Sequence, residues 1–451
     1  MVNNNRVSGK ELKSSLMLVT LAASFGLPFF ALTGGPALTG FTRQLGAGDF
    51  VYTVIMSMPV IGAVIQVLMS YIIEATGRRK SMKITSGLIH RLLWIPIALV
   101  PFIILPDYTN ARIWTVTIII AISATANSIN GIAFNSWMGS LVPTEIKGRF
   151  FGKRTMIYTI TGGIAALAGG KLMDINPGLP GFSIVFIIAA VLGTIDIVMF
   201  FWIKEPSLKR PDKVPVFHKM FTEPFKNKNY MKYTLFIALW YFGVNITAPF
   251  LSVYMIEELR MSYLAITLFT QVAASFTTIL FIRFWGRLAD KYGSKPVMWL
   301  CCVAIIIMPL MWIFVTRDSI WIVLVINLLS GIFWSGFELT AMNQSIWLAP
   351  EQNRSIYIAN YSLVVNVIGA ALAFLCGGAF MQLTGNAVRA LQLPLLGGQF
   401  LSSYHLLFFI SGIVRLLVVI LVFRSYGEKN SKTAADIMSG LFFGVRAGIH
   451  R

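Results

Sequence analysis

The stretch GRLADKYGSK (286–295) joins two long apolar segments and carries more structural information than any other part of the sequence. A counterpart in the first half of the chain, SYIIEATGRRK (70–80), also lies between two apolar segments. In each copy an acidic residue, Glu74 or Asp290, precedes a glycine by three positions, and basic residues surround that glycine. Glycine is needed where φ is positive or where two helices approach closely. Both copies therefore predict a short, charged turn between two helices.

A second internal match lies further along each half. The stretch IAALAGGKLMD (164–174) resembles ALAFLCGGAFM (371–381), and each contains a pair of glycines. Each follows a link that contains a proline, Pro143 or Pro350. One such match can arise by chance, but two at a similar offset indicate a duplicated unit. The small residues of both runs predict close approach of helix backbones.

The composition indicates a membrane protein. Of the 451 residues 56% are hydrophobic and 12% are charged, whereas soluble proteins average about 25% charged residues. The mean hydropathy is +0.74. The three cysteines lie in apolar stretches without metal-ligand spacing, so neither a disulfide framework nor a zinc site is indicated. We therefore expect most of the surface to face lipid.

Twelve apolar segments approach or exceed the roughly 20 residues that a bilayer crossing requires. They lie at residues 14–39, 49–73, 84–105, 113–141, 154–174, 181–203, 230–256, 261–285, 296–315, 319–348, 355–384 and 402–424. A longer connection rich in Lys and Pro separates the first six from the last six. We therefore expect an N-terminal six-helix bundle (1–203), a cytoplasmic loop (204–229), a C-terminal bundle (230–424) and a cytoplasmic tail (425–451).

The basic residues are unevenly distributed among the links. About 30 of the 37 lie in the N-terminus, the even-to-odd links, the central connection and the tail, as the positive-inside rule expects of cytoplasmic segments. This predicts that both termini are cytoplasmic, in a multi-pass protein of the plasma or inner membrane. The net charge of +19 is then a topology signal, so we expect the lipid bilayer and not nucleic acid as a partner.

These motifs resemble those of the major facilitator superfamily. The signature after the eighth helix of that family, G-x-L-a-D-r-x-G-r-k, is matched by Gly286, Leu288, Asp290, Gly293 and Lys295. The link EIKGRFFGKR also resembles the usual loop between the fourth and fifth helices. The resemblance implies an all-α membrane protein, with twelve transmembrane helices arranged as two pseudo-symmetric six-helix bundles. The subfamily is not assignable, because neither the drug-antiporter nor the sugar-porter motifs are complete.

In relatives the charged turns are thought to latch the cytoplasmic gate. By that resemblance the gating residues here are Glu74, Gly77, Arg78, Gly286, Arg287, Asp290, Lys291 and Gly293. An acidic side chain at a helix end lies within reach of the basic residues in its own loop and of a neighbouring helix N-terminus. The alternative is a plain basic loop with a capped turn.

Glu338 is the best candidate for a coupling group. Ionisable groups inside a membrane are costly and therefore indicate function. The resemblance places Glu338 on the tenth helix, one of four that line the central cavity of relatives. At 100° per residue, Asn327, Trp334, Glu338 and Ser345 share one helix face, and a carboxylate there could bind a cation or a proton. The alternative is a structural pair with a neighbour.

Polar and aromatic residues on the cavity-lining helices form a candidate substrate site. Asn127 and Asn130 lie three apart, and Tyr241 and Asn245 four apart, so each pair shares one side of its helix. The predicted cavity residues are Asn127, Asn130, Trp240, Tyr241, Asn245, Asn327 and Trp334. Such a site suits a polar solute with an apolar plane, such as a sugar. Hydrogen bonding between helices is an equally good explanation.

Other intramembrane charges receive structural interpretations. Asp196 and Arg415 occupy nearly equivalent places on the sixth and twelfth helices, which are peripheral in relatives, so we expect local pairing or snorkelling. His90 and Arg91 are expected to contact lipid head groups near the inner interface.

The function that the resemblance implies is secondary active transport of a small polar organic solute by alternating access, coupled to H⁺ or Na⁺. The alternatives are an efflux pump or a lipid flippase of the same fold, and a non-transporting membrane sensor. No Walker, H-E-x-x-H or G-x-S-x-G motif occurs in the sequence. We therefore expect no enzyme, no cofactor and a monomer.

Overall fold

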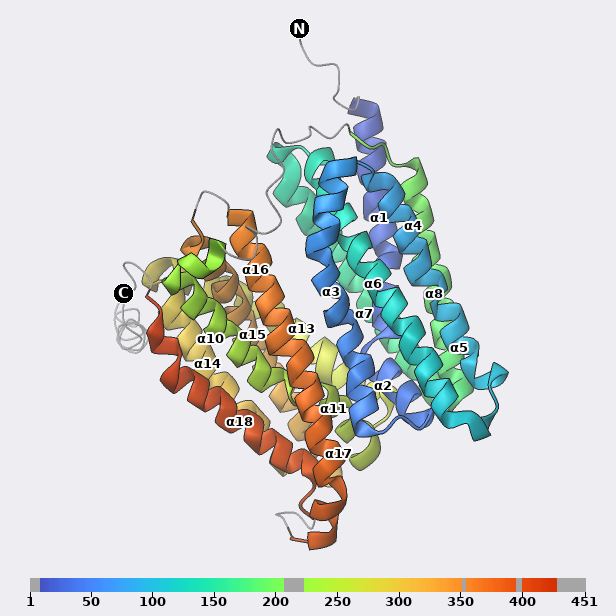
Figure 1. Ribbon diagram of the computed structural model, residues 1–451, viewed down its shortest axis with the longest axis vertical. Coiled ribbons are helices and arrows are strands. Elements are labelled where there is room, and N and C mark those ends of the chain that lie inside the picture. The colour runs from blue at the N-terminus through green and yellow to red at the C-terminus, as the bar shows by residue number, and fades with distance from the viewer. Residues whose placement is uncertain (1–8, 207–222, 351–353, 395–399, 428–451) are drawn as a thin grey trace, which may run out of the picture. The chain divides into compact units, whose positions relative to one another are not determined.

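The chain is all-helical in the parts that the structure describes. The computed structural model (Figure 1) describes residues 9–206, 223–350, 354–394 and 400–427, without the side chains at 63–64, 67–68, 70–71, 74–75, 355 and 424. Every named element in these ranges is a helix or a helical turn. The expected all-α class is thereby confirmed, and the predicted tail lies mostly outside the described residues.

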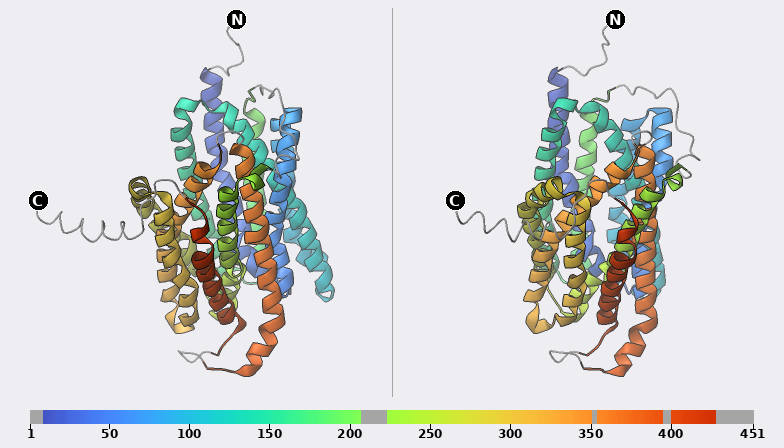
Figure 2. Two further views of the ribbon diagram at one scale, coloured as in Figure 1. Left: turned by 60° about the vertical axis from the view of Figure 1, so that its left-hand side comes forward. Right: turned by 90° about the vertical axis from the view of Figure 1, so that its left-hand side faces the viewer.

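Two compact units make up the chain. Unit 1 comprises Met1–Pro215 and Met261–Thr267, and unit 2 comprises Val216–Arg260 and Leu268–Arg451. Within each unit the long helices lie side by side along roughly the same axis, and the chain passes back and forth through them (Figure 2). The two units are described separately below.

Unit 1 contains nine α-helices among its described residues. They are α1 (Gly9–Thr33), α2 (Gly35–Gln44), α3 (Asp49–Thr76), α4 (Arg79–Leu92), α5 (Trp94–Ile103), α6 (Thr109–Leu141), α7 (Lys147–Ile175), α8 (Leu179–Val198) and α12 (Tyr263–Thr267). Short 3₁₀ turns η1 (Pro106–Tyr108), η2 (Thr144–Ile146) and η3 (Met199–Trp202) connect or extend them. The short helix α12 joins unit 1 because Asp174, at the end of α7, accepts the backbone N–H groups of Tyr263 and Leu264 at 2.8 and 3.1 Å.

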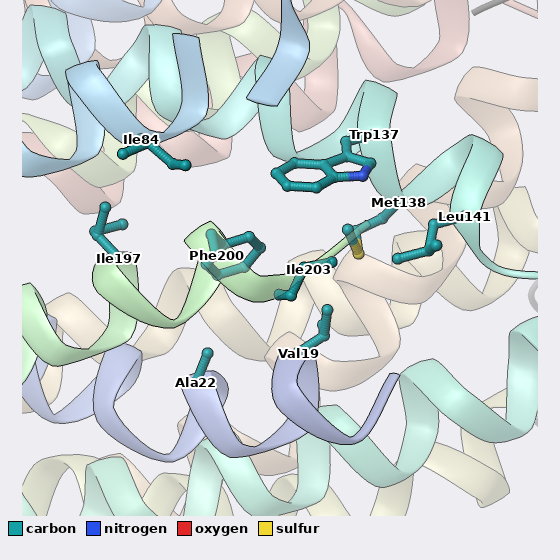
Figure 3. Packing of buried hydrophobic residues seen from close by; sticks show 9 residues of the cluster. All are labelled: Val19, Ala22, Ile84, Trp137, Met138, Leu141, Ile197, Phe200 and Ile203. Carbon is teal, nitrogen blue, oxygen red and sulfur yellow. The ribbon is translucent and has the colours of Figure 1, made fainter. Parts of the chain in front are cut away.

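The core of unit 1 forms where α1, α4, α6 and α8 meet. Figure 3 shows the ring of Phe200 close to Trp137, with aliphatic side chains of the surrounding helices closing around the two rings. The two ring centroids lie 5.7 Å apart at an edge-to-face angle of 63°, an arrangement that aromatic pairs favour. This packing fixes the first half of α1, the start of α4 and the C-terminal ends of α6 and α8 relative to one another.

Unit 2 contains eight α-helices whose bounds lie wholly within its described residues. They are α10 (Lys228–Asn245), α11 (Ala248–Val253), α13 (Ala273–Tyr292), α14 (Ser294–Met311), α15 (Trp321–Leu348), α16 (Arg354–Asn366), α17 (Ala373–Leu391) and α18 (Ser403–Leu421). Three π-helical turns, η4 (Tyr254–Glu258), η5 (Leu268–Val272) and η8 (Val367–Leu372), interrupt the α-helical pattern. Asn227 begins α10 as its N-cap, because its side chain accepts the N–H of Tyr230 at 3.1 Å.

Eleven helical stretches of the described residues are long and apolar enough to cross a membrane, and Asp49–Gly62 at the start of α3 is a shorter apolar helix. Together they match the twelve predicted segments in order. For example, the segment predicted at 296–315 corresponds to the span Ser294–Phe314. The two cytoplasmic termini stay a prediction.

Candidate functional site

The predicted coupling residue Glu338 lies in unit 2 beside two aromatic rings. Its side chain is exposed on α15, and its Oε1 accepts the hydroxyl of Tyr241 from α10 at 2.5 Å. The ring of Tyr241 stacks on Trp334, one turn before Glu338, with centroids 6.2 Å apart and planes 30° apart. The structure therefore brings together three of the predicted residues, from two helices, as a carboxylate with an aromatic wall.

The other predicted residues of unit 2 lie around this group in different roles. Trp240 is completely buried and packs against Phe337 with centroids 5.4 Å apart. Asn245 donates its amide to the carbonyl of Gly369, in the π-helical turn η8, at 2.7 Å. Asn327 donates to Val323 of its own helix at 2.8 Å and lines a small cavity with Trp334. Trp240 thus packs in the core, and Asn245 ties α10 to the helix that contains η8.

The two predicted asparagines of unit 1 differ in their surroundings. Asn130 is buried and exchanges two hydrogen bonds with Lys83 of α4: its Oδ1 accepts Lys83 Nζ at 2.8 Å, and its Nδ2 donates to the Lys83 carbonyl at 2.8 Å. Lys83 Nζ also lies 4.5 Å from the ring centroid of Phe200. Asn127 is half-buried on the same side of α6. Lys83 was missed by sequence reasoning because it follows a basic turn and resembles a topology signal.

Asp196 pairs with Arg91 in the interior of unit 1. Arg91 Nη2 donates to Asp196 Oδ2 at 3.1 Å, with the two side chains 3% and 10% exposed. The guanidinium carbon lies 3.9 Å from the ring centroid of Phe29 on α1. The local pairing expected for Asp196 is thus found. The expected head-group contacts are wrong: Arg91 and His90 are both buried, and His90 bonds the hydroxyl of Ser123 at 2.7 Å, because α4 packs these polar groups against α6 and α8.

The predicted charged turns have the same backbone geometry in both units. Gly77 ends α3 with φ +70°, and its N–H donates to Ile73 at 2.8 Å. Gly293 ends α13 with φ +98°, and its N–H donates to Ala289 at 2.9 Å. A residue with a side chain is strained at such φ values. These turns are therefore where glycine is required for conformation.

The charged residues of the turns face outward in their own units. Arg78, Arg287, Asp290 and Lys291 are exposed, and within the described part of the chain Asp290 forms no ion pair. The side chain of Glu74 lies outside the described residues. At Gly286 an added Cβ would meet Leu339 at 3.8 Å, an ordinary contact. The gating role of all eight residues stays a prediction.

A basic residue two positions after each turn glycine is tied to its own unit instead. Arg79 is completely buried at the start of α4 and donates to Glu205, to the carbonyl of Ser136 and to the carbonyl of Pro206, at 3.3, 3.1 and 2.5 Å. Its equivalent in unit 2, Lys295, donates to the carbonyl of Tyr426. Arg79 thus connects α4 to the segment after α8, and Lys295 connects α14 to the segment after α18. This equivalence could be found from the sequence, because the alignment of Gly77 with Gly293 places Arg79 opposite Lys295.

Comparison with protein families identifies the chain. The family model of the Major Facilitator Superfamily matches residues 16–273 and 233–442. The chain belongs to the major facilitator superfamily. The two overlapping matches correspond to the duplication that the sequence indicates. A search of curated proteins finds no match.

Several solved structures share this fold. The nucleoside transporter NupG has a TM-score of 0.63 at 15% identity, covering 91% of this chain and 98% of its own. A D-xylose-proton symporter has a TM-score of 0.66 at 13% identity, with 94% and 100% covered. A bacterial homologue of the iron transporter ferroportin, in an inward-facing state, has a TM-score of 0.65 at 16% identity, with 93% and 99% covered. At these identities the similarity shows the fold.

Proposed function

We propose that this member of a transporter superfamily carries a small polar organic solute by alternating access, with a sugar-like solute as the best fit, and that Glu338 couples this movement to H⁺. The observation that carries the proposal is the hydrogen bond from Tyr241 to Glu338 beside the ring of Trp334. Intramembrane carboxylates in transporters commonly serve as proton relays. A stacked aromatic wall offers an apolar plane, and the carboxylate offers an acceptor for hydroxyl groups at its edge.

The experiment compares two modes of transport in proteoliposomes. Glu338→Gln keeps the size of the side chain and much of its hydrogen bonding but removes the titratable charge. Counterflow exchanges solute without net ion movement, so the variant should retain it, whereas accumulation driven by a proton gradient should fail. The variant Glu258→Gln, at the far end of η4, is the matched control because, among the described residues, its carboxylate makes a long ion pair of 3.9 Å with Arg389.

The outcomes distinguish coupling from a structural role. Accumulation by Glu338→Gln equal to that of the native protein would exclude Glu338 as the coupling group. If accumulation depends on a Na⁺ gradient and not on a proton gradient, the coupling ion is Na⁺ and not H⁺. Binding of solute by the native protein without any counterflow would indicate a sensor.

A further inference from the structure

A small cavity inside unit 2 is lined by one basic side chain and by no acidic one. It encloses about 120 Å³ between α10, α11, α14, α15 and α18, and Arg415 of α18 lines it. Arg415 is buried, at 6% exposed. Its Nε and Nη1 donate to the carbonyls of Gly243 and Ile305 at 3.5 and 3.3 Å, which are long hydrogen bonds. A guanidinium has five N–H donors, so these two contacts leave much of its capacity unused.

Arg415 lacks the counter-charge that the buried arginine of unit 1 has. Arg91 is paired with Asp196 at 3.1 Å, whereas no carboxylate of the described residues forms an ion pair with Arg415. A buried charge without a partner is strongly destabilising, because the lost hydration is not replaced by an opposite charge. The guanidinium of arginine is a strong base that is ordinarily charged in proteins. The interior of unit 2 therefore favours an anion beside this guanidinium.

The side chains that line the cavity include several hydrogen-bond donors and no acidic group. The indole rings of Trp312 and Trp334 line it, and each indole carries an N–H that only donates. Ser330 contributes a hydroxyl, while the hydroxyl of Thr247 is already donated to Val244 at 3.0 Å. A water needs roughly 10–15 Å³ of such space. The cavity is thus large enough for one small anionic group with accompanying water.

We propose that Arg415, together with Ser330 and the indoles of Trp312 and Trp334, binds a monovalent anion, either a free halide ion or the carboxylate group of the transported solute. Trp334 connects the two sites, because its ring lines the cavity and also stacks on Tyr241. Ser330 lies eight residues before Glu338, about 12 Å along the helix. The alternative in which the anion is a solute carboxylate (the carboxylate arm) rests on the proposed transport function. The alternative in which it is a free halide ion (the halide arm) is independent of that function.

Thermal unfolding of the purified full-length protein tests the halide arm. A ligand that binds only the folded state raises the melting temperature in a saturable way. Sodium chloride and sodium bromide should each do so relative to the bulky sulfonate MES at equal ionic strength. Arg415→Gln should abolish the response, and Ser330→Ala should raise the half-saturating halide concentration about tenfold, the effect of one hydrogen bond to a charge. If Arg415→Gln does not fold, the halide response of Ser330→Ala alone tests the site.

Arg112→Gln is the matched control. Arg112 is a buried arginine of unit 1 whose Nε and Nη2 donate to the carbonyls of Ile104 and Pro101 at the shorter distances of 2.7 and 2.6 Å. Its variant should keep the full halide response of the native protein. Anomalous diffraction from crystals grown in bromide should place the ion beside Arg415.

Matched solutes test the carboxylate arm and distinguish the two sources. If halides have no effect but glucuronate stabilises the native protein more than glucose does, and Arg415→Gln loses that difference, the anion is a solute carboxylate. No response to chloride, bromide or glucuronate overturns the proposal, and so does a response that both Arg415→Gln and Ser330→Ala retain unchanged. A halide response in a protein that shows no solute flux would leave the anion site in place and remove the transport proposal.

Discussion

Buried charges in unit 1 depend on their partners at the level of single residues. Asp196→Asn would leave Arg91 buried without its carboxylate, and removal of one partner of a buried pair costs about 3–5 kcal/mol. We therefore expect a lower melting temperature in detergent for this variant. Asp107→Asn, at an exposed position of η1, is the control and should be neutral.

The double variant Arg91→Leu with Asp196→Leu separates charge from packing. Replacement of a whole buried pair by apolar side chains is often neutral or stabilising. The double variant should therefore recover most of the stability that Asp196→Asn loses. Equal destabilisation of the two proteins would mean that the pair contributes through shape, because the rings of Phe29 and Phe30 both pack on the guanidinium.

Tyr241 positions the carboxylate of Glu338 and should affect solute binding. Tyr241→Phe keeps the ring that stacks on Trp334 but removes the hydroxyl donated at 2.5 Å. A hydrogen bond to a charged group contributes about 1.5–3 kcal/mol, so we expect the apparent solute affinity in counterflow to fall about tenfold. Tyr233→Phe is the control on the same helix, because its hydroxyl bonds the carbonyl of Ala341 in the core. That variant should change stability alone.

Helix packing in unit 2 depends on one close approach at the element scale. A Cβ added at Gly377 of α17 would lie 2.3 Å from the carbonyl oxygen of Ile246, a backbone atom after α10. Gly377→Ala should therefore push the helices apart and cost about 1–3 kcal/mol. Gly385→Ala on the same helix has no atom within 4 Å of the added group, so it should stabilise the helix slightly. Equal melting temperatures for the two variants would contradict the close approach.

The positions of the helices along the sequence could be predicted more completely than the contacts between one helix and another. Apolar runs and turn glycines locate the spans because lipid requires continuous helices, and Gly77 and Gly293 cap their helices as the motif indicates. Periodicity shows which residues share a helix face, and so it grouped Trp334 with Glu338. It does not show which helix lies opposite, so the pairing of Asn130 with Lys83 and the addition of Met261–Thr267 to unit 1 needed coordinates.

The duplication of the chain leads to a prediction at the scale of the whole molecule. Each unit ties one basic residue after its turn glycine, Arg79 or Lys295, to backbone carbonyls of its own unit. Arg78, Arg287, Asp290 and Lys291 are exposed, and Asp290 forms no ion pair among the described residues. We therefore predict that this carboxylate binds a partner in one state of the transport cycle and not in another.

Asp290→Asn should accordingly shift the resting population toward the inward-open state. Loss of the carboxylate leaves the like charges of Arg287 and Lys291 without a counter-charge in their turn, so a closed cytoplasmic gate becomes less stable. A cysteine introduced at Asn127, half-buried on α6, should react faster with a thiol reagent added from the cytoplasmic side. Asp318→Asn, in the turn η7 (Arg317–Ser319) of the same unit, is the control, because its carboxylate lies on a different link. If Asp290→Asn leaves both the labelling rate and the flux unchanged, the turn determines topology alone, and the gate must close through other contacts.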